Sequence, residues 1–442
     1  MSAPLTPPVL GALPPALGAA ARRIAAAVGG VGGVAYLVGG AVRDALLGLP
    51  IKDLDLEVHG LDAEALASAL RRVGPVRAVG RSFGVFKLRV RGLDEPVDVA
   101  LPRGLGPRAG GGEVAVVGDP HVGIDAALRG RDLSINAMAV RLPDGALVDP
   151  CGGQGDLAAG LLRPADPLRF GEDPLRALRA ARFAARFGFA LSPALVAACA
   201  GLPVGAEPVE RRITEVEAIL LGPRPAVGLA ALRALGVEEA ALPGLGGAPL
   251  PAAPRLPAPA RRPTGEALAV ALVALLAARR DAAPTLLDGL GLHSRGGFPV
   301  RAQVLAAWPW LDAAPAEAAG PLADRWLRRG AELLRVDLAL EAAAATDADP
   351  VWPARLDRAW ALGVQAAPLL PLVSGAELRA LGLPPGPLIG AAQRLVRAAQ
   401  LDGQIADPEA AVALVRAALA EGALAAGPPR RDRPAAPALD MD

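Results

Sequence analysis

Cysteine, histidine and lysine are scarce in this chain. The 2 cysteines exclude a disulfide framework and a cysteine-rich zinc site. None of the 3 histidines, His59, His121 and His293, has another metal-binding residue at ligand spacing, so a histidine-built metal site is not expected. Lysine occurs only at Lys52 and Lys87, so arginine carries nearly all of the positive charge.

Long apolar segments and an excess of charge are also lacking. The longest apolar run, Ala267 to Ala278, is too short to span a bilayer. The Pro- and Ala-rich stretch from Met1 to Leu17 lacks the basic region of a signal peptide. Lys+Arg total 46 against Asp+Glu 45, a formal net charge of +1, so any basic surface must be local. These absences predict a soluble cytoplasmic protein with no membrane partner.

Material for packed cores is abundant. Hydrophobic residues make up 52% and charged residues 21% of the chain, and its 442 residues are typical of two to four domains. Helix and strand signals alternate up to Asp149, and helical periods dominate afterwards. We therefore expect an α+β fold, in which a small α/β head is followed by an all-α neck, body and tail.

Shifts in composition divide the chain into expected segments. Seven prolines lie between Pro243 and Pro263, which is typical of a linker. Within the neck, one helix is expected from Asp166 to Phe187. The expected segments are an N-terminal extension with a first helix at 1–33, the head at 34–150, the neck at 151–242, the linker at 243–263, the body and tail at 264–426 and a disordered end at 427–442.

The first chemical pattern is a strand signal, Val34 to Val38, that runs into Gly39-Gly40 and a helix start. Glycines let the backbone approach a phosphate closely, and a helix N-terminus offers unpaired N–H groups. Arg43 is placed to add a charge-assisted hydrogen bond to a triphosphate. The pattern therefore predicts a phosphate-binding turn.

Two aspartates follow this turn on a second strand signal. Residues at i and i+2 of a strand point to the same side, so Asp53 and Asp55 can share one or two Mg²⁺ ions. Two such ions clamp the attacking and leaving oxygens in nucleotidyl transfer. A dinucleotide fingerprint at Gly30, Gly32 and Ala35 is rejected, because that motif should follow a strand and here it precedes one.

The second pattern is the block from Gly130 to Met138, which holds a charged pair and then small and apolar residues. It is consistent with a helix start in which Asp132 lies near the cap. It is also consistent with nucleotide binding, with Arg131 reaching a phosphate or a base and Asn136 contacting a sugar. Taken alone, the block favours the first interpretation.

The third pattern is an arginine-rich helix preceded by acidic residues. Glu172 and Asp173 precede Pro174, which fits the first turn of a helix. A carboxylate beside a guanidinium can match the donor and acceptor edge of a base, so this region is a candidate for nucleotide selection. The arginines, which share an arc of about 120° on a helix, are Arg176, Arg179, Arg182 and Arg186.

Together these blocks resemble those of the class II tRNA nucleotidyltransferase (CCA-adding enzyme) and bacterial poly(A) polymerase family. The similarity covers residues 34 to about 240, and a segment at 373–390 resembles the tail of the same family. No family motif is found at 245–365. The matching stretches are 36–58, 97–103, 131–138, 149–156 and 170–187.

The resemblance implies a nucleotidyltransferase head and template-independent, Mg²⁺-dependent addition of CTP- and ATP-derived nucleotides to the 3′ end of tRNA. The tRNA would lie along body and tail. Asp53 and Asp55 would be catalytic and hold the metal, with Asp98 a weaker candidate for a third carboxylate. The implied nucleotide-binding residues are Gly39, Gly40, Arg43, Arg131, Asn136, Glu172, Asp173, Arg176, Arg179 and Arg182.

Poly(A) polymerase, or an enzyme that adds only CC or only A, is the main alternative. The single Arg81 in the block 79–83 favours the tRNA enzyme, because poly(A) polymerases of the family tend to have two basic residues there. A noncatalytic nucleotide- or RNA-binding protein is a distant alternative, against which the intact Asp53 and Asp55 argue. Gly130 replaces the arginine that usually opens the second block, and the glycine-rich loop 104–130 lacks the charged pattern common in the family.

Overall fold

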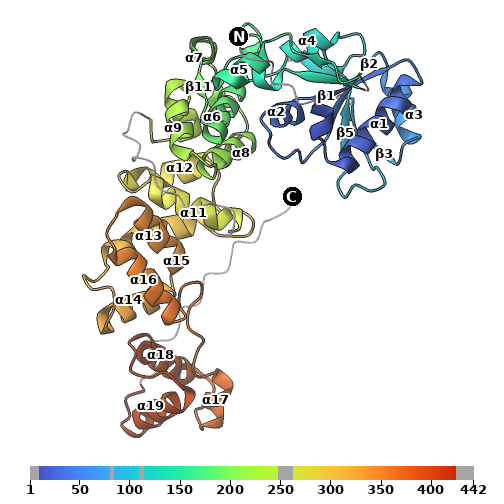
Figure 1. Cartoon of the computed structure of the whole chain (residues 1–442). Helices are drawn as coiled ribbons and strands as arrows, with labels where there is room; N and C mark the ends of the chain where they lie inside the picture. Colours follow the sequence, from blue (N-terminus) through green and yellow to red (C-terminus); the bar gives the residue numbers. More distant parts are fainter. Residues whose placement is uncertain (1–8, 80–83, 109–113, 143, 247–261, 425–442) are drawn as a thin grey trace, which may run out of the picture. The chain divides into compact units, whose positions relative to one another are not determined.

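The computed structural model describes residues 9–79, 84–108, 114–142, 144–246 and 262–424 (Figure 1). The chain divides into two compact units. The N-terminal unit holds residues 1–249 with 289–291, and the C-terminal unit holds 250–288 with 292–442. The block 80–83, most of the expected linker and the expected disordered end lie outside the described residues.

A seven-stranded mixed sheet forms the centre of the head. Its strand order is β3-β4-β5-β2-β1-β8-β9, and β2 and β5 are the parallel neighbours in an otherwise antiparallel arrangement. The strands are β1 (Val34–Val38), β2 (Asp55–His59), β3 (Val76–Val79), β4 (Val85–Leu88), β5 (Val97–Ala100), β8 (Ala139–Leu142) and β9 (Leu147–Val148). The strand expected from Val34 to Val38 is therefore present, and the second strand signal corresponds to β2.

The sheet has one apolar and one polar face near its middle. Leu56 and Val58 of β2 are fully buried, as period-two alternation requires. Asp55 and Glu57 point to the opposite face, where Asp55 is in register with Asp98 of β5. The polar face thus carries the acidic side chains of the predicted site.

The helices of the head begin at local signals in the sequence. Pro15 opens α1 (Pro15–Gly29), and the Asp62 carboxylate accepts a hydrogen bond from the Ala65 N–H at the start of α3 (Ala63–Arg71). Helices α1 and α3 pack on each other and on the sheet. The remaining elements of the head are η1 (Val9–Ala12), α2 (Gly40–Leu46), the strand pair β6 (Arg103–Arg108) and β7 (Val114–Gly118), α4 (Ile124–Arg129) and η2 (Ser134–Asn136). The expectation of a loop at 104–130 is therefore wrong, because the β-prone residues from Val114 to Val117 pair with β6 and a helix follows them.

The neck is mostly helical and is centred on α6 (Arg176–Phe187). The buried face of α6 consists largely of alanine, which lets α8 (Val209–Leu220) and α9 (Pro225–Ala234) pack closely against it. The other elements are α5 (Gly153–Ala159), η3 (Phe170–Glu172), α7 (Pro193–Cys199), η4 (Val204–Ala206), α10 (Glu238–Ala241) and the two-residue parallel strands β10 (Leu161–Leu162) and β11 (Ala190–Leu191).

The expectation that one helix runs from Asp166 to Phe187 is wrong at its start. Helix α6 begins at Arg176, and the turn before it includes Pro174. Asp173 is extended, with φ −135° and ψ 103°. The physical reason is the proline ring, which disfavours the helical conformation for the residue before it. Asp173 and Arg176 consequently lie in a turn and at a helix start, not on one helical face.

Helices and the loops between them make up the described residues of the C-terminal unit, apart from an isolated β-bridge between Arg295 and Phe298. Its core surrounds α11 (Thr264–Leu275), which is buried on nearly all sides and packs on α13 and α15. Trp310 and Trp326 join α13 to α14, with parallel rings whose centroids are 3.9 Å apart. The further elements are η6 (Arg280–Ala282), α12 (Ala283–Gly289), α13 (Val300–Asp312), α14 (Pro321–Gly330), α15 (Val336–Thr346), α16 (Val351–Ala361), α17 (Gly375–Ala380), α18 (Pro387–Leu401) and α19 (Pro408–Ala420).

The segment that resembles the family's tail has a local structural role. The Ser374 hydroxyl accepts a hydrogen bond from the Glu377 N–H at the start of α17, and the Glu377 carboxylate accepts one from the Ser374 N–H. Together these two bonds form a complete capping box. Leu378 then packs into a small core with residues of α18 and α19. The pattern Ser-Gly-Ala-Glu-Leu therefore specifies a helix start and a core contact.

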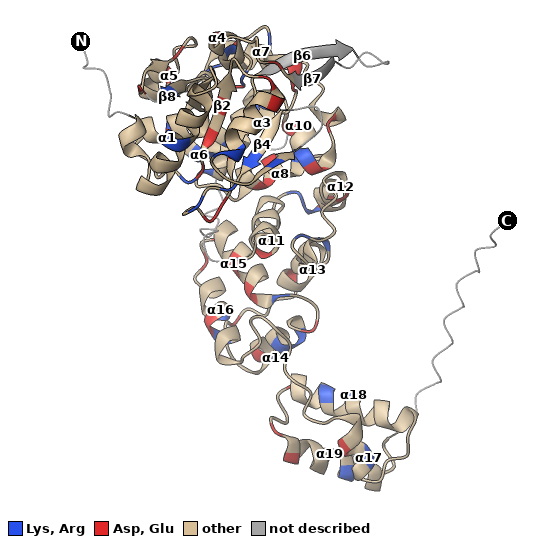
Figure 2. Cartoon of the chain, turned by 90° about the vertical axis from the view of Figure 1, so that its right-hand side faces the viewer, with Lys and Arg blue, Asp and Glu red and all other residues tan. Residues whose placement is uncertain are grey.

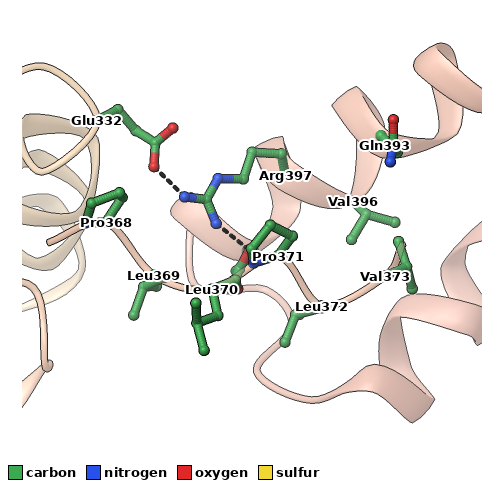
Figure 3. A pocket seen from close by; sticks show the side chains of 11 residues that line it. Glu332, Pro368, Leu369, Leu370, Pro371, Leu372, Val373, Gln393, Val396 and Arg397 are labelled. Atoms are coloured by element: carbon green, nitrogen blue, oxygen red, sulfur yellow. Dashed lines mark hydrogen bonds and ion pairs between the residues drawn. The ribbon is translucent and has the colours of Figure 1, made fainter. Parts of the chain in front are cut away.

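A cavity of about 370 Å³ lies in the C-terminal unit, beside the extended segment that leads into α17 (Figure 3). Arg397 of α18 forms an ion pair with Glu332 and donates to Gln400, which in turn donates to the Leu370 carbonyl. These contacts tether the extended segment to α18. The lining is mainly apolar, and its proline and leucine residues come from 368–372.

Charged residues of both signs are interspersed along the ribbon of each unit (Figure 2). This mixing is compatible with a formal net charge of +1. Within the described residues, no helix is long and apolar enough to cross a membrane.

We predict that Gly228→Val lowers the free energy of unfolding by about 1–3 kcal/mol, because overpacking a close helix contact is costly. A Cβ atom at Gly228 of α9 would lie 2.7 Å from the Ala185 side chain of α6. Urea unfolding measures the change. Gly205→Val is the matched control, because the nearest atom to a Cβ there, on Ala240, is 4.0 Å away. Equal destabilisation by the two substitutions would contradict this account.

Candidate functional site

The site begins with three aspartates at one edge of the head. Asp55 opens β2, and Asp98 is its register partner on β5. The expectation that Asp53 shares this strand is wrong, because β2 begins at Asp55 and Asp53 lies just before it. Lys87 of β4 forms an exposed ion pair with Asp98, with 2.8 Å between Nζ and Oδ1. The parallel pairing of β2 and β5 brings these carboxylates together, and spacing along the sequence could not reveal it.

Electrostatics shows how closely the three carboxylates interact. Loss of solvation raises the pKa of Asp55, and the negative charges of Asp98 and Asp53 raise it further. Arg131 and Lys87 oppose this rise. A divalent cation with oxygen ligands would relieve the repulsion, so the donor set fits Mg²⁺. Within the described residues, however, no group of three or more His, Cys, Asp or Glu side chains is close enough to enclose a metal ion.

The glycine turn lies at the end of β1, as predicted. Gly39 has a positive φ of 67°, which suits glycine, and Gly40 is the first residue of α2. A Cβ atom on Gly39 would lie 2.8 Å from Nη1 of Arg131. The turn and Arg131 are therefore in direct contact, although 92 residues separate them in the sequence.

Arg43 lies inside the protein and is only 4% exposed. Its Nε donates to Asp44, and Nη1 donates to Oδ1 of Asn136 at 2.5 Å. Its guanidinium lies 5.1 Å from the ring centroids of both Phe183 and Phe187 of α6. Burial is the main cause of the lowered pKa of Arg43. In this structure Arg43 thus connects the head to the neck.

Asp132, which the sequence placed near a helix cap, is the buried centre of this connection. Its carboxylate accepts hydrogen bonds from the Leu133 N–H and from Nδ2 of Asn136. Arg179 of α6 donates to its other oxygen at 2.8 Å. Burial alone would raise the pKa of Asp132, but the charge of Arg179 and these hydrogen bonds lower it. Sequence reasoning gave Asp132 no functional role.

A second buried carboxylate, Glu57, also escaped the sequence analysis. One oxygen accepts from Nη2 of Arg131 at 3.1 Å, and the other lies 3.0 Å from Nε2 of His59. Burial would raise the pKa of Glu57, but His59 and Arg131 outweigh it and the pKa is lowered. The alternation of β2 predicts the direction of Glu57, whereas its partner Arg131 comes from a distant loop.

The neck residues predicted to select a nucleotide lie at the start of α6. Arg176 donates to the Arg169 carbonyl at 2.8 Å and to the Gly130 carbonyl at 2.7 Å. Asp173 instead forms an ion pair with Arg211 at 3.3 Å, and Glu172 pairs with Arg169 at 2.8 Å. The side chains of Asp173 and Arg176 therefore hold different partners. The hydrogen bond between the two residues is a backbone one, in which the Arg176 N–H donates to the Asp173 carbonyl at 3.0 Å.

The other arginines of the predicted stripe are also paired. Arg182 lies 2.6 Å from Glu215, as a close ion pair without hydrogen-bond geometry. Arg186 reaches Asp44 of the head at 3.0 Å. Successive turns of α6 thus contact Gly130, Asp132 and Asp44 of the head through Arg176, Arg179 and Arg186. The arginine stripe joins neck to head.

The position of Gly130 is covered by another arginine. A Cβ atom on Gly130 would lie 3.2 Å from Nη1 of Arg169. Residue 130 has no side chain of its own, but the Arg169 guanidinium of the neck lies next to the position where such a side chain would begin.

We predict that Asp132→Asn lowers the free energy of unfolding by about 2 kcal/mol or more, because it leaves Arg179 without its charged partner. The lowered pKa of Asp132 means that its contribution is present above the unfolded-state pKa and is lost as pH falls below about 4. Urea unfolding of the wild type should show this loss, and the variant should lack that part of it. Asp144→Asn, at an exposed pair with Arg141, should have little effect.

Comparison with known proteins shows what the head is similar to. Residues 35–163 match the model described as the Poly A polymerase head domain. The "Multifunctional CCA protein" of Nitrosococcus oceani is 47% identical over 163 residues, 37% of each chain. That of Ectopseudomonas mendocina is 40% identical over 215 residues, 47% of this chain and 50% of the relative. These matches span about a third to a half of the relatives' length.

Solved structures extend the similarity to the rest of the described chain. The CCA-adding enzyme of Bacillus stearothermophilus, solved in complex with CTP, is 26% identical to this chain and has a TM-score of 0.69. The match covers 93% of this chain and 100% of that enzyme. The CCA-adding enzyme of Thermotoga maritima, complexed with tRNA, has the same fold at 21% identity, with a TM-score of 0.66 over 93% of this chain and 98% of that one. The chain thus resembles the class II tRNA nucleotidyltransferase and poly(A) polymerase family both in its head sequence and in its fold.

Proposed function

We propose that this protein is a nucleotidyltransferase that adds CTP- and ATP-derived nucleotides to the 3′ end of tRNA, in the cytoplasm and without a template. The observation that carries the proposal is the placement of Asp55 and Asp98 side by side on β2 and β5, on a head of the matched family. Asp53 adjoins the pair. Relatives named for this activity and structures solved with CTP and tRNA support it.

In this proposal the acidic edge binds Mg²⁺ through Asp53 and Asp55, with Asp98 as a further oxygen donor. The bound metal would supply charge neutralisation for the triphosphate and activation of the attacking hydroxyl. The backbone of Gly39 and Gly40 would approach the phosphates, and Arg131 would pair with them. Arg43 now donates a hydrogen bond to Asn136. When the nucleotide binds, contacts of Arg43 with the triphosphate and of Asn136 with the sugar would replace part of this hydrogen bonding.

Choice of nucleotide is assigned to the start of α6. Asp173 accepts and Arg176 donates, so the two could match the base edges of CTP and ATP. Glu172, Arg179 and Arg182 complete the pocket in this proposal. Using Arg176 in this way would require its guanidinium to leave the carbonyl groups of Gly130 and Arg169. The body and tail would hold the tRNA through local arginines and phosphate contacts.

We predict that the purified chain incorporates label from CTP and ATP into tRNA that lacks its 3′ CCA end, in the presence of Mg²⁺. Asp53→Ala and Asp55→Ala should remove at least about 99% of this activity, because the metal clamp acts on the transition state. Gel analysis of the extended tRNA distinguishes full CCA addition from CC-only or A-only products.

Binding of tRNA, measured separately, should stay within about twofold of wild type in both variants, because phosphate contacts elsewhere hold the RNA. Near wild-type turnover by either variant would refute the metal assignment. Long adenosine tracts on unrelated RNA would identify a poly(A) polymerase instead. No incorporation by the wild type would refute the proposed function.

We predict that Arg176→Ala lowers discrimination between CTP and UTP by about tenfold, since an unpaired polar partner costs about 1–3 kcal/mol per contact. Competition assays with both nucleotides measure the ratio. Arg211→Ala removes the partner of Asp173 without touching Arg176, and serves as a control for loss of charge in the same region. An unchanged ratio in Arg176→Ala would contradict the assignment.

A further inference from the structure

A hydrogen-bond network of Glu57, His59 and Arg131 lies next to Asp55 of the proposed metal site. Glu57 is 7% exposed and lies two residues beyond Asp55 on the same face of β2. His59 contacts one of its carboxylate oxygens and Arg131 donates to the other. Each carboxylate oxygen of Glu57 therefore has a side-chain partner, and together the two partners fix the orientation of the carboxylate.

His59 is itself fixed on two sides. Its Nδ1 lies 2.9 Å from the Val122 carbonyl, which can only accept, so Nδ1 donates. The ring meets Tyr36 edge-on, with 5.2 Å between the centroids. Tyr36 is the cross-strand partner of Glu57 on β1. His59 and Tyr36 thus form a rigid support for Glu57.

Arg131 is the more exposed end of this network. Its side chain is 27% exposed, and Nη1 lies against Gly39 of the glycine turn. Among the described residues, Nη2 is its atom with a hydrogen-bond partner, so Nε and Nη1 can donate to a ligand. Without Glu57, this long side chain would be free to turn away from Gly39, and binding would have to order it.

We propose that Glu57 is a positioning residue: it holds Arg131 against Gly39, so that the N–H groups of Nε and Nη1 of Arg131 meet the phosphates of the incoming nucleotide. The proposal rests on the proposed function. Phosphates are common to CTP and ATP, so Glu57 governs the binding of both nucleotides equally. This role concerns the phosphates and not the choice of base, which is assigned to the neck.

Kinetic analysis of Glu57→Gln, Arg131→Ala and the double variant tests this. Glu57→Gln should raise the KM for CTP and for ATP by the same factor, about three- to tenfold, which is the cost of ordering one long side chain. The KM for tRNA and the Mg²⁺ concentration for half-maximal activity should not change. In the Arg131→Ala background, Glu57→Gln should have no further effect on nucleotide KM. Asp144→Asn, at an exposed arginine pair of the same sheet, is the control.

Several results would overturn the proposal. Independent effects of Glu57→Gln and Arg131→Ala would show that Glu57 does not act through Arg131. A changed Mg²⁺ requirement would make Glu57 a metal ligand, and a change for only one nucleotide would make it a base-selecting residue. Should Glu57→Gln fail to fold, Glu57→Asp keeps the buried charge but shortens its reach, and it should raise both KM values; wild-type values would refute the proposal.

Equilibrium binding of CTP and ATP, measured by calorimetry on the same variants, separates this proposal from the proposed function. If the wild type binds both nucleotides but extends no tRNA, the proposed function fails. Weaker binding of both nucleotides by Glu57→Gln would still support the role of Glu57. Unchanged binding of both would overturn it, whatever the enzyme's activity.

Discussion

The buried carboxylate of Asp132 is the interaction on which the arrangement of head and neck depends. It is charged in a place with little solvent, and Arg179, Asn136 and the Leu133 N–H supply the compensation. Asn136 in turn fixes Arg43, which lies against the aromatic rings of α6. Removing the charge at the centre would leave several buried polar groups without partners, which is why one residue influences so much of the site.

Arginine on α6 holds the neck and the head together. On α6 it carries bonds from neck to head, and the planar guanidinium suits this because it can donate to a carboxylate and stack on an aromatic ring together. Because these arginines already bond to groups of the head, a count of arginines overstates the positive charge that is available to bind RNA. This explains how an arginine-rich helix coexists with a net charge of +1. Nucleotide binding through Arg176 would compete with the carbonyl groups that now hold it.

Much of the head could be predicted from the sequence because its signals are local. The strands at Val34 and Asp55 follow from period-two alternation, and the turn at Gly39 follows from the need for a positive φ. The start of α6 was misplaced, because the effect of Pro174 on Asp173 competes with a strong helical period nearby. The roles of Glu57 and Asp132 were not predicted, because a buried charge is recognised only through its partners.

By itself, the sequence determined the strand from Val34 to Val38, the alternation of β2, the glycine turn at Gly39, and the family whose motifs the chain resembles. These depend on periodicity and neighbouring residues, which are properties of short segments. Only the tertiary structure decided that Asp98 lies beside Asp55 and that Arg131 lies against Gly39 while it donates to Glu57. The bonds from α6 to the head, such as that of Arg179 to Asp132, were likewise decided there. Those contacts join residues far apart in the chain, and packing alone selects them.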